Sequence, residues 1–164
     1  MTATPPKSDE FRIERSKVIA ATPQDIFALI EDFQNWGRWS PYEKLDPKMA
    51  RTFSSPSRGK GASYAWESKG RGGVGRMEIL DLLPASKIVI ELAFTKPMKT
   101  RNEAHFLLVP QGRATRVTWI MTGRHTALSK LMHKVLGLDK MIARDFEAGL
   151  ADLKFAVEDQ SVSA

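Results

Sequence analysis

Residues 127–157 read ALSKLMHKVLGLDKMIARDFEAGLADLKFAV and decide the fold of this chain. Their apolar side chains recur at steps of three and four residues, namely at Leu128, Leu131, Val135, Leu138, Ile142, Phe146, Leu150, Leu153 and Val157. This spacing is the period of one face of an α-helix and continues for about eight turns. Lys140, Arg144 and Ala148 fall on the opposite face. The stretch therefore predicts a long amphipathic helix that has one face to bury.

The chain before this helix alternates between apolar and polar residues with the period of two that is typical of β-strands. Such runs cover residues 10–20, 51–54, 62–66, 75–81, 88–94, 100–109 and 116–121. Most are joined by short turns, so we expect neighbouring strands to pair antiparallel. The pattern predicts an α+β fold in which a curved antiparallel sheet of about seven strands wraps around the long helix.

Two short helices are expected after the first strand. Thr22 and Pro23, followed by Asp25, are typical of a helix start, because threonine caps the helix and proline suits its first position. A second short helix is expected at 32–39, and Pro41 ends it because the residue before a proline resists helical geometry.

Length and composition predict one domain at residues 10–158 of the 164, with polar tails at 1–9 and 159–164. No run approaches the ~18 apolar residues of a membrane span. The first ten residues lack the apolar core of a signal peptide, so we expect no membrane span and a cytoplasmic location. Without cysteine the chain has no disulfide, no thiolate nucleophile and no cysteine-ligated metal.

The net charge of +6 raises the question of a polyanionic partner. The basic residues are scattered, however, and the densest group, Lys69, Arg71 and Arg76, surrounds a glycine-rich turn at 70–75. No basic run is interleaved with aromatic residues as in a nucleic-acid platform. The pattern favours a solvated surface and predicts no nucleic-acid partner.

Three local signatures point to a known family. They are WGRWSP at 36–41, GASYAW at 61–66 followed by GRM at 75–77, and TRVTWIMTG at 115–123 together with DFEAGL at 145–150. With this order of elements, the chain resembles the START-like (SRPBCC) superfamily of the helix-grip fold, also called the polyketide cyclase/dehydrase and lipid transport family. The resemblance implies a cavity between the long helix and the concave face of the sheet, with small hydrophobic molecules as ligands.

Alternation along the strands and the buried face of the helix select the residues that would line this cavity. They are Trp39, Tyr64, Trp66, Met77, Phe94, Asn102, Phe106, Trp119, Met121, Ile142, Phe146 and Gly149. Aromatic and methionine side chains offer large, adaptable apolar contacts. Gly149 is expected to leave space, because it has no side chain on the buried face. The same stripe is also typical of a packed core, and the sequence leaves both interpretations open.

Candidates for catalysis are few. His125 follows the last strand near the expected rim, and Asp81 shares the inward alternation at a strand end. Tyr64, Thr100 and Asn102 could orient a ligand carbonyl through hydrogen bonds. No nucleophile–base pair and no metal-ligand spacing is found, so we predict no catalytic residue, no metal and no cofactor.

The leading hypothesis is the binding or carriage of a small hydrophobic molecule, such as a lipid or a polyketide-like compound, without catalysis. An enzyme of the polyketide cyclase or dehydratase type is the alternative, and it is suggested by the resemblance alone. A second alternative is an interaction module like those of chaperone activators. It is favoured by apolar residues on the outer face of the sheet, which could also support a homodimer: Val89, Leu107, Val109 and Ile120.

Overall fold

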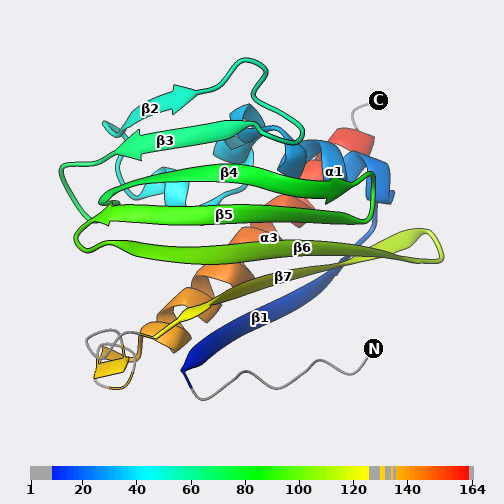
Figure 1. Cartoon of the computed structure of the whole chain (residues 1–164). Coiled ribbons are helices and arrows are strands. Elements are labelled where there is room, and N and C mark those ends of the chain that lie inside the picture. The colour runs from blue at the N-terminus through cyan, green and yellow to red at the C-terminus, as the bar shows by residue number, and fades with distance from the viewer. Residues whose placement is uncertain (1–8, 126–129, 132–133, 135, 163–164) are drawn as a thin grey trace.

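Seven strands form one curved antiparallel sheet, and the helices lie on one of its faces (Figure 1). The computed structural model describes residues 9–125, 130, 131, 134 and 136–162. The strands are β1 (Glu10–Ile19), β2 (Ala50–Phe53), β3 (Ser63–Glu67), β4 (Val74–Leu83), β5 (Lys87–Lys96), β6 (Thr100–Gln111) and β7 (Ala114–Arg124). Their order in the sheet is β1-β7-β6-β5-β4-β3-β2. The predicted meander is therefore confirmed from β2 to β7, and β1 joins the sheet beside β7.

The first helix, α1 (Pro23–Glu31), begins as predicted, because the Thr22 side chain accepts a hydrogen bond from the backbone N–H of Asp25 at 3.2 Å. The second short helix is the 3-10 helix η1 (Phe33–Arg38), capped by Asp32. A further 3-10 helix, η2 (Pro41–Lys44), was not predicted. Ser40 caps η2, and Pro41 occupies its first position, so the proline that ends one helix begins the next.

The terminal helix α3 (Leu138–Val162) is shorter than the sequence predicts. Gly137 has a φ of 61°, a conformation that glycine adopts easily and that interrupts a right-handed helix. The prediction of one continuous helix from residue 127 is therefore wrong, and Leu131, expected on its buried face, is 58% exposed. Leu128 and Val135 lie outside the described residues. The predicted stripe is confirmed beyond this point, where the buried residues are Phe146, Leu150, Leu153 and Val157.

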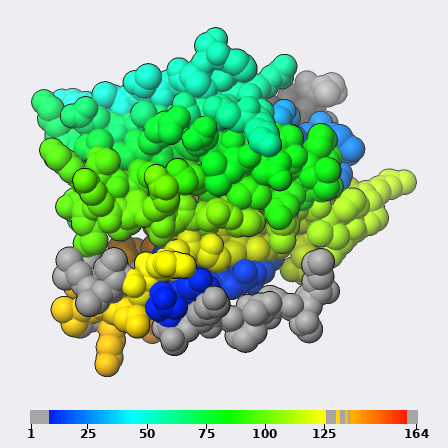
Figure 2. All heavy atoms as spheres, in the orientation of Figure 1, coloured from blue at the N-terminus to red at the C-terminus, as the bar shows by residue number. Residues whose placement is uncertain are grey.

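The core lies between the concave face of the sheet and the layer of α1, η1 and α3. Figure 2 shows the opposite, convex face, where the β6–β7 hairpin projects beyond the sheet. On this face Val89 and Ile120 are buried among their neighbours, Leu107 is half-buried and Val109 is exposed. Of the four apolar residues predicted on this face, only Val109 therefore has a largely exposed side chain. No helix in the described part of the chain is long and apolar enough to span a bilayer.

Candidate functional site

Cross-strand pairing places half of the predicted ligand residues in three neighbouring rows on the concave face. One row contains Tyr64, Met77, Leu92 and Asn102, each paired with the next across β3, β4, β5 and β6. A row on one side contains Trp66, Gly75 and Phe94. A row on the other side contains Ile79, Ile90, Ala104 and Met121. The sheet therefore brings residues far apart in the sequence onto one surface.

The helix and the sheet meet directly at Trp119. The Trp119 and Phe146 rings are stacked, with centroids 4.0 Å apart and an interplanar angle of 7°. Trp39 contacts the Trp119 and Phe106 rings edge-on, at 5.6 and 5.8 Å. These four predicted ligand residues are all buried. Around Trp119 these four side chains form a packed aromatic core.

Gly149 serves close packing here. A Cβ atom at Gly149 would lie 2.9 Å from Cδ of Pro41 and 2.9 Å from Cζ3 of Trp119. Gly149 therefore does not leave the empty space that is expected from the sequence, and that prediction is wrong. Pro41 of η2 and Trp119 of the sheet occupy the space that a side chain would need. Because Gly149 has no side chain, α3 can approach both elements closely.

Gly149→Ala is expected to destabilise the protein. The added methyl group would force Pro41 or Trp119 to move, at a cost of about 1–3 kcal/mol. That cost exceeds the ~1 kcal/mol that alanine gains over glycine in a helix. Urea unfolding would measure the change, with Gly37→Ala as the control because nothing lies within 4 Å of a Cβ added at Gly37. A Gly149→Ala protein as stable as the parent would contradict this packing.

Another part of the concave face remains partly open. Met77, Leu92, Phe94 and Asn102, named here the open patch, are half-buried, whereas Ile79 and Ile90 of the next row are buried. Ile142 of α3 is also half-buried. Within the described residues, α3 packs mainly on β1 and η2 and leaves the central strands less covered. Three predicted ligand residues, Met77, Phe94 and Asn102, thus lie close together on a part of the sheet whose side chains are only half-buried.

A polar cluster borders the open patch at Tyr64. The Tyr64 hydroxyl donates a hydrogen bond to Oε1 of Glu43 at 2.6 Å, and Nε of Arg51 donates to Oε2 of Glu43 at 2.7 Å. The Glu43 and Arg51 side chains are only 12% and 25% exposed. Neither Glu43 nor Arg51 is among the residues predicted from the sequence. Neither residue lies in a motif that would have identified it.

The neighbouring residue of η2 forms a second phenol–carboxyl pair. Burial raises the pKa of Tyr42, and the adjacent Asp145 carboxyl raises it further. The pKa of Tyr64 is raised in the same way, first by burial and then by the hydrogen bond to Glu43. Burial also raises the pKa of Asp145 above its usual value. Both phenols therefore stay protonated at neutral pH and act as neutral hydrogen-bond groups beside the concave face.

The two weaker candidates for catalysis lie apart from this cluster. Asp81 is exposed, because the pairing of β4 with β5 shifts register between Ile79 and Asp81 and ends the alternation on which the prediction relied. The His125 ring lies at the end of β7, 5.2 Å from the Phe11 ring. A role for His125 stays a prediction.

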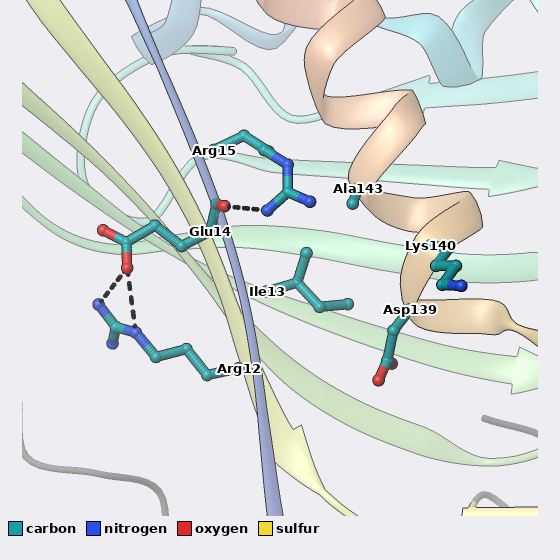
Figure 3. Close-up of a pocket in the computed structure, with 7 residues that line it drawn as sticks. All are labelled: Arg12, Ile13, Glu14, Arg15, Asp139, Lys140 and Ala143. Carbon is teal, nitrogen blue, oxygen red and sulfur yellow. Dashed lines mark hydrogen bonds and ion pairs between the residues drawn. The ribbon is translucent and has the colours of Figure 1, made fainter. Parts of the chain in front are cut away.

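Two surface hollows occur at the start of α3. One, of about 170 Å³, lies at the seam between β1 and α3 and is lined by Arg12, Ile13, Glu14, Arg15, Asp139, Lys140 and Ala143 (Figure 3). Its β1 cations are already paired, since Arg12 contacts Glu14 at 3.2 Å and Arg15 contacts Glu147 at 2.9 Å. The other, of about 460 Å³, is lined by Leu136, Gly137, Lys140, Met141, Arg144 and Asp145. Neither hollow is lined by a predicted ligand residue.

Comparison with models of known protein families tests the resemblance that the sequence signatures indicate. The model of the polyketide cyclase/dehydrase and lipid transport family matches residues 10–158. The chain belongs to this family. The relationship expected from the sequence signatures is thereby confirmed, and the family's name spans both enzymes and lipid carriers.

Solved structures agree on the helix-grip fold. MLL2253 from Mesorhizobium loti superposes with a TM-score of 0.68 at 12% identity, covering 91% of this chain and 98% of that one. The Aha1 dimer from Colwellia psychrerythraea gives 0.63 at 19% identity, covering 90% and 96%. DynU16, from the dynemicin biosynthetic locus, gives 0.63 at 13% identity, covering 90% and 47%. At these identities the likeness shows the fold alone. Among curated protein sequences, none matches significantly.

Proposed function

We propose that this member of the polyketide cyclase/dehydrase and lipid transport family binds a small hydrophobic molecule at the open patch. The observation that carries the proposal is the change in burial across the concave face. Ile79 and Ile90 are buried, while Met77, Leu92 and Phe94 beside them keep exposed apolar surface. Covering such a surface with an apolar ligand is favourable by about 25 cal/mol for each Å² removed from water.

The surroundings of the open patch suit an apolar molecule that carries one polar group. Trp66 packs edge-on against Phe94, with centroids 5.4 Å apart, and gives the site an aromatic border. Asn102 contributes an amide, and the protonated phenol of Tyr64 lies in the same row. The packed aromatic core at Trp119 forms a rigid support beside them. A few polar groups around an apolar surface are typical of small-molecule sites.

Leu92→Gln is expected to weaken binding of a hydrophobic ligand by about ten-fold or more, because an amide replaces apolar contact surface. Leu107→Gln is the matched control: Leu107 is also a half-buried leucine, but it lies on the convex face. Mass spectrometry after solvent extraction would identify any molecule that co-purifies. Titration with fatty acids and with aromatic polyketides, followed by tryptophan fluorescence, would give the affinities. A parent protein that binds none of these probes, or equal weakening by both substitutions, would refute the site.

An enzyme of the cyclase or dehydratase type is the second candidate. It is favoured by the pair of Tyr42 and Asp145, because such reactions require proton transfer and a carboxyl with a raised pKa, such as that of Asp145, is a suitable general acid. Turnover of poly-β-keto substrates by the parent, and its loss in Tyr42→Phe and Asp145→Asn, would support catalysis. Unchanged rates in both variants would exclude these groups from the reaction. The chaperone-activator-like alternative, the homodimer and the cytoplasmic location stay predictions.

A further inference from the structure

Large apolar side chains are exposed where α3 begins. Leu131, Leu136 and Met141 are 58%, 68% and 53% exposed. All three fall within residues 131–141 of the sequence, and Leu136 and Met141 line one hollow. Water-exposed apolar groups gathered in one place are typical of an interaction surface.

Cations alternate with these apolar residues. Lys130, Lys134, Lys140 and Arg144 are all exposed. Residues 130–145 contain only two carboxylates, those of Asp139 and Asp145, and Asp145 is half-buried beside Tyr42. Among the described residues, no carboxylate lies within ion-pair distance of Lys140 or Arg144. Their charges are therefore available to an external anion.

The hollow of about 460 Å³ combines both properties at one site. Leu136 and Met141 line it together with Lys140 and Arg144. These four residues are named here the α3-start surface. Its composition resembles that of the lipid-facing side of an interfacial helix, where leucines enter the boundary of the headgroups and lysines or arginines contact the phosphates.

We infer that the α3-start surface docks on an anionic lipid bilayer. Charge complementarity selects this occupant, because Lys140 and Arg144, which have no carboxylate partner among the described residues, match lipid phosphates, while the adjacent Leu136 and Met141 match the acyl region. A nucleic acid would use the cations and leave Leu136 and Met141 in water. An apolar protein partner would leave the cations unused. Docking of this kind goes beyond the proposed ligand site and does not depend on it.

Vesicle sedimentation with the full chain tests the inference. The parent is expected to sediment with phosphatidylcholine vesicles that contain phosphatidylglycerol, to remain in solution with phosphatidylcholine alone, and to be released by high salt. Lys140→Glu/Arg144→Glu is expected to weaken binding by about a hundred-fold, because each basic residue near an anionic surface contributes about five-fold in affinity and the new carboxylates repel the lipid. Leu136→Ser/Met141→Ser is expected to weaken it by at least ten-fold.

Matched controls separate docking from general effects of charge and folding. Arg113→Glu/Arg116→Glu changes the net charge equally at exposed positions in and beside the β6–β7 hairpin, and Val109→Ser removes an exposed apolar residue from the convex face. Both control variants should bind as the parent does, and circular dichroism would confirm that every variant is folded. The inference is overturned if the parent ignores anionic vesicles, if the α3 variants retain full affinity, or if the charge control loses as much.

Discussion

Phe146→Ala is expected to lower the free energy of unfolding by about 3–5 kcal/mol. The Phe146 ring is fully buried and stacks on Trp119 at 4.0 Å, so its removal leaves a cavity where α3 meets the sheet. The surrounding rings of Trp39 and Phe106 pack against Trp119 and limit any collapse into that space. Urea unfolding followed by circular dichroism would measure the loss.

Phe155→Ala is the matched control, because Phe155 lies on the same helix and its side chain is 71% exposed. We expect this variant to change stability by less than about 0.5 kcal/mol. Equal losses in the two variants would mean that the helix-to-sheet contact is not the main source of stability at α3.

Arg51→Met is expected to cost about 2–4 kcal/mol, because it leaves the Glu43 carboxylate largely buried without its cation. Within the described part of the chain, the Tyr64 hydroxyl would then be the one hydrogen-bond donor left to the Glu43 carboxylate. The double variant Glu43→Gln/Arg51→Met should recover part of the loss, since an amide costs less to bury than an unpaired charge. Thermal and urea unfolding at neutral pH would measure both changes.

Arg15→Met provides the comparison, because the Arg15–Glu147 pair has a similar distance of 2.9 Å but side chains that are 44% and 60% exposed. Exposed pairs contribute less than about 1 kcal/mol, so this variant should remain close to the parent. If Arg51→Met is as mild as Arg15→Met, the Glu43 carboxylate is better hydrated than its burial indicates.

Local patterns in the sequence predict the elements of this fold well. Alternation placed Tyr64 and Trp66 on the concave face, and the three- and four-residue spacing placed Phe146 and Leu150 on the buried side of α3. Both patterns follow from the geometry of a single strand or helix, so no knowledge of the partner surface is needed. The order of strands then follows largely from short connections.

Features that depend on a change of local geometry or on distant partners were not predictable. The helical spacing of apolar residues runs through Gly137 without a break, although the positive φ of this glycine interrupts the helix. A register shift removed Asp81 from the face that its position indicated. The pairing of Glu43 with Tyr64 joins residues separated by 21 positions, and no sequence pattern records that contact.

The last three residues of η2 each contact another element. Tyr42 lies beside Asp145 of α3, Glu43 bonds Tyr64 of β3 and Arg51 of β2, and Lys44 pairs with Asp152 of α3 at 3.2 Å. This one short turn consequently ties the terminal helix to the far edge of the sheet. Backbone amides in η2, β3 and the middle of α3 should therefore exchange with deuterium as a single cooperative unit, since none of these elements can separate from the others until η2 releases them.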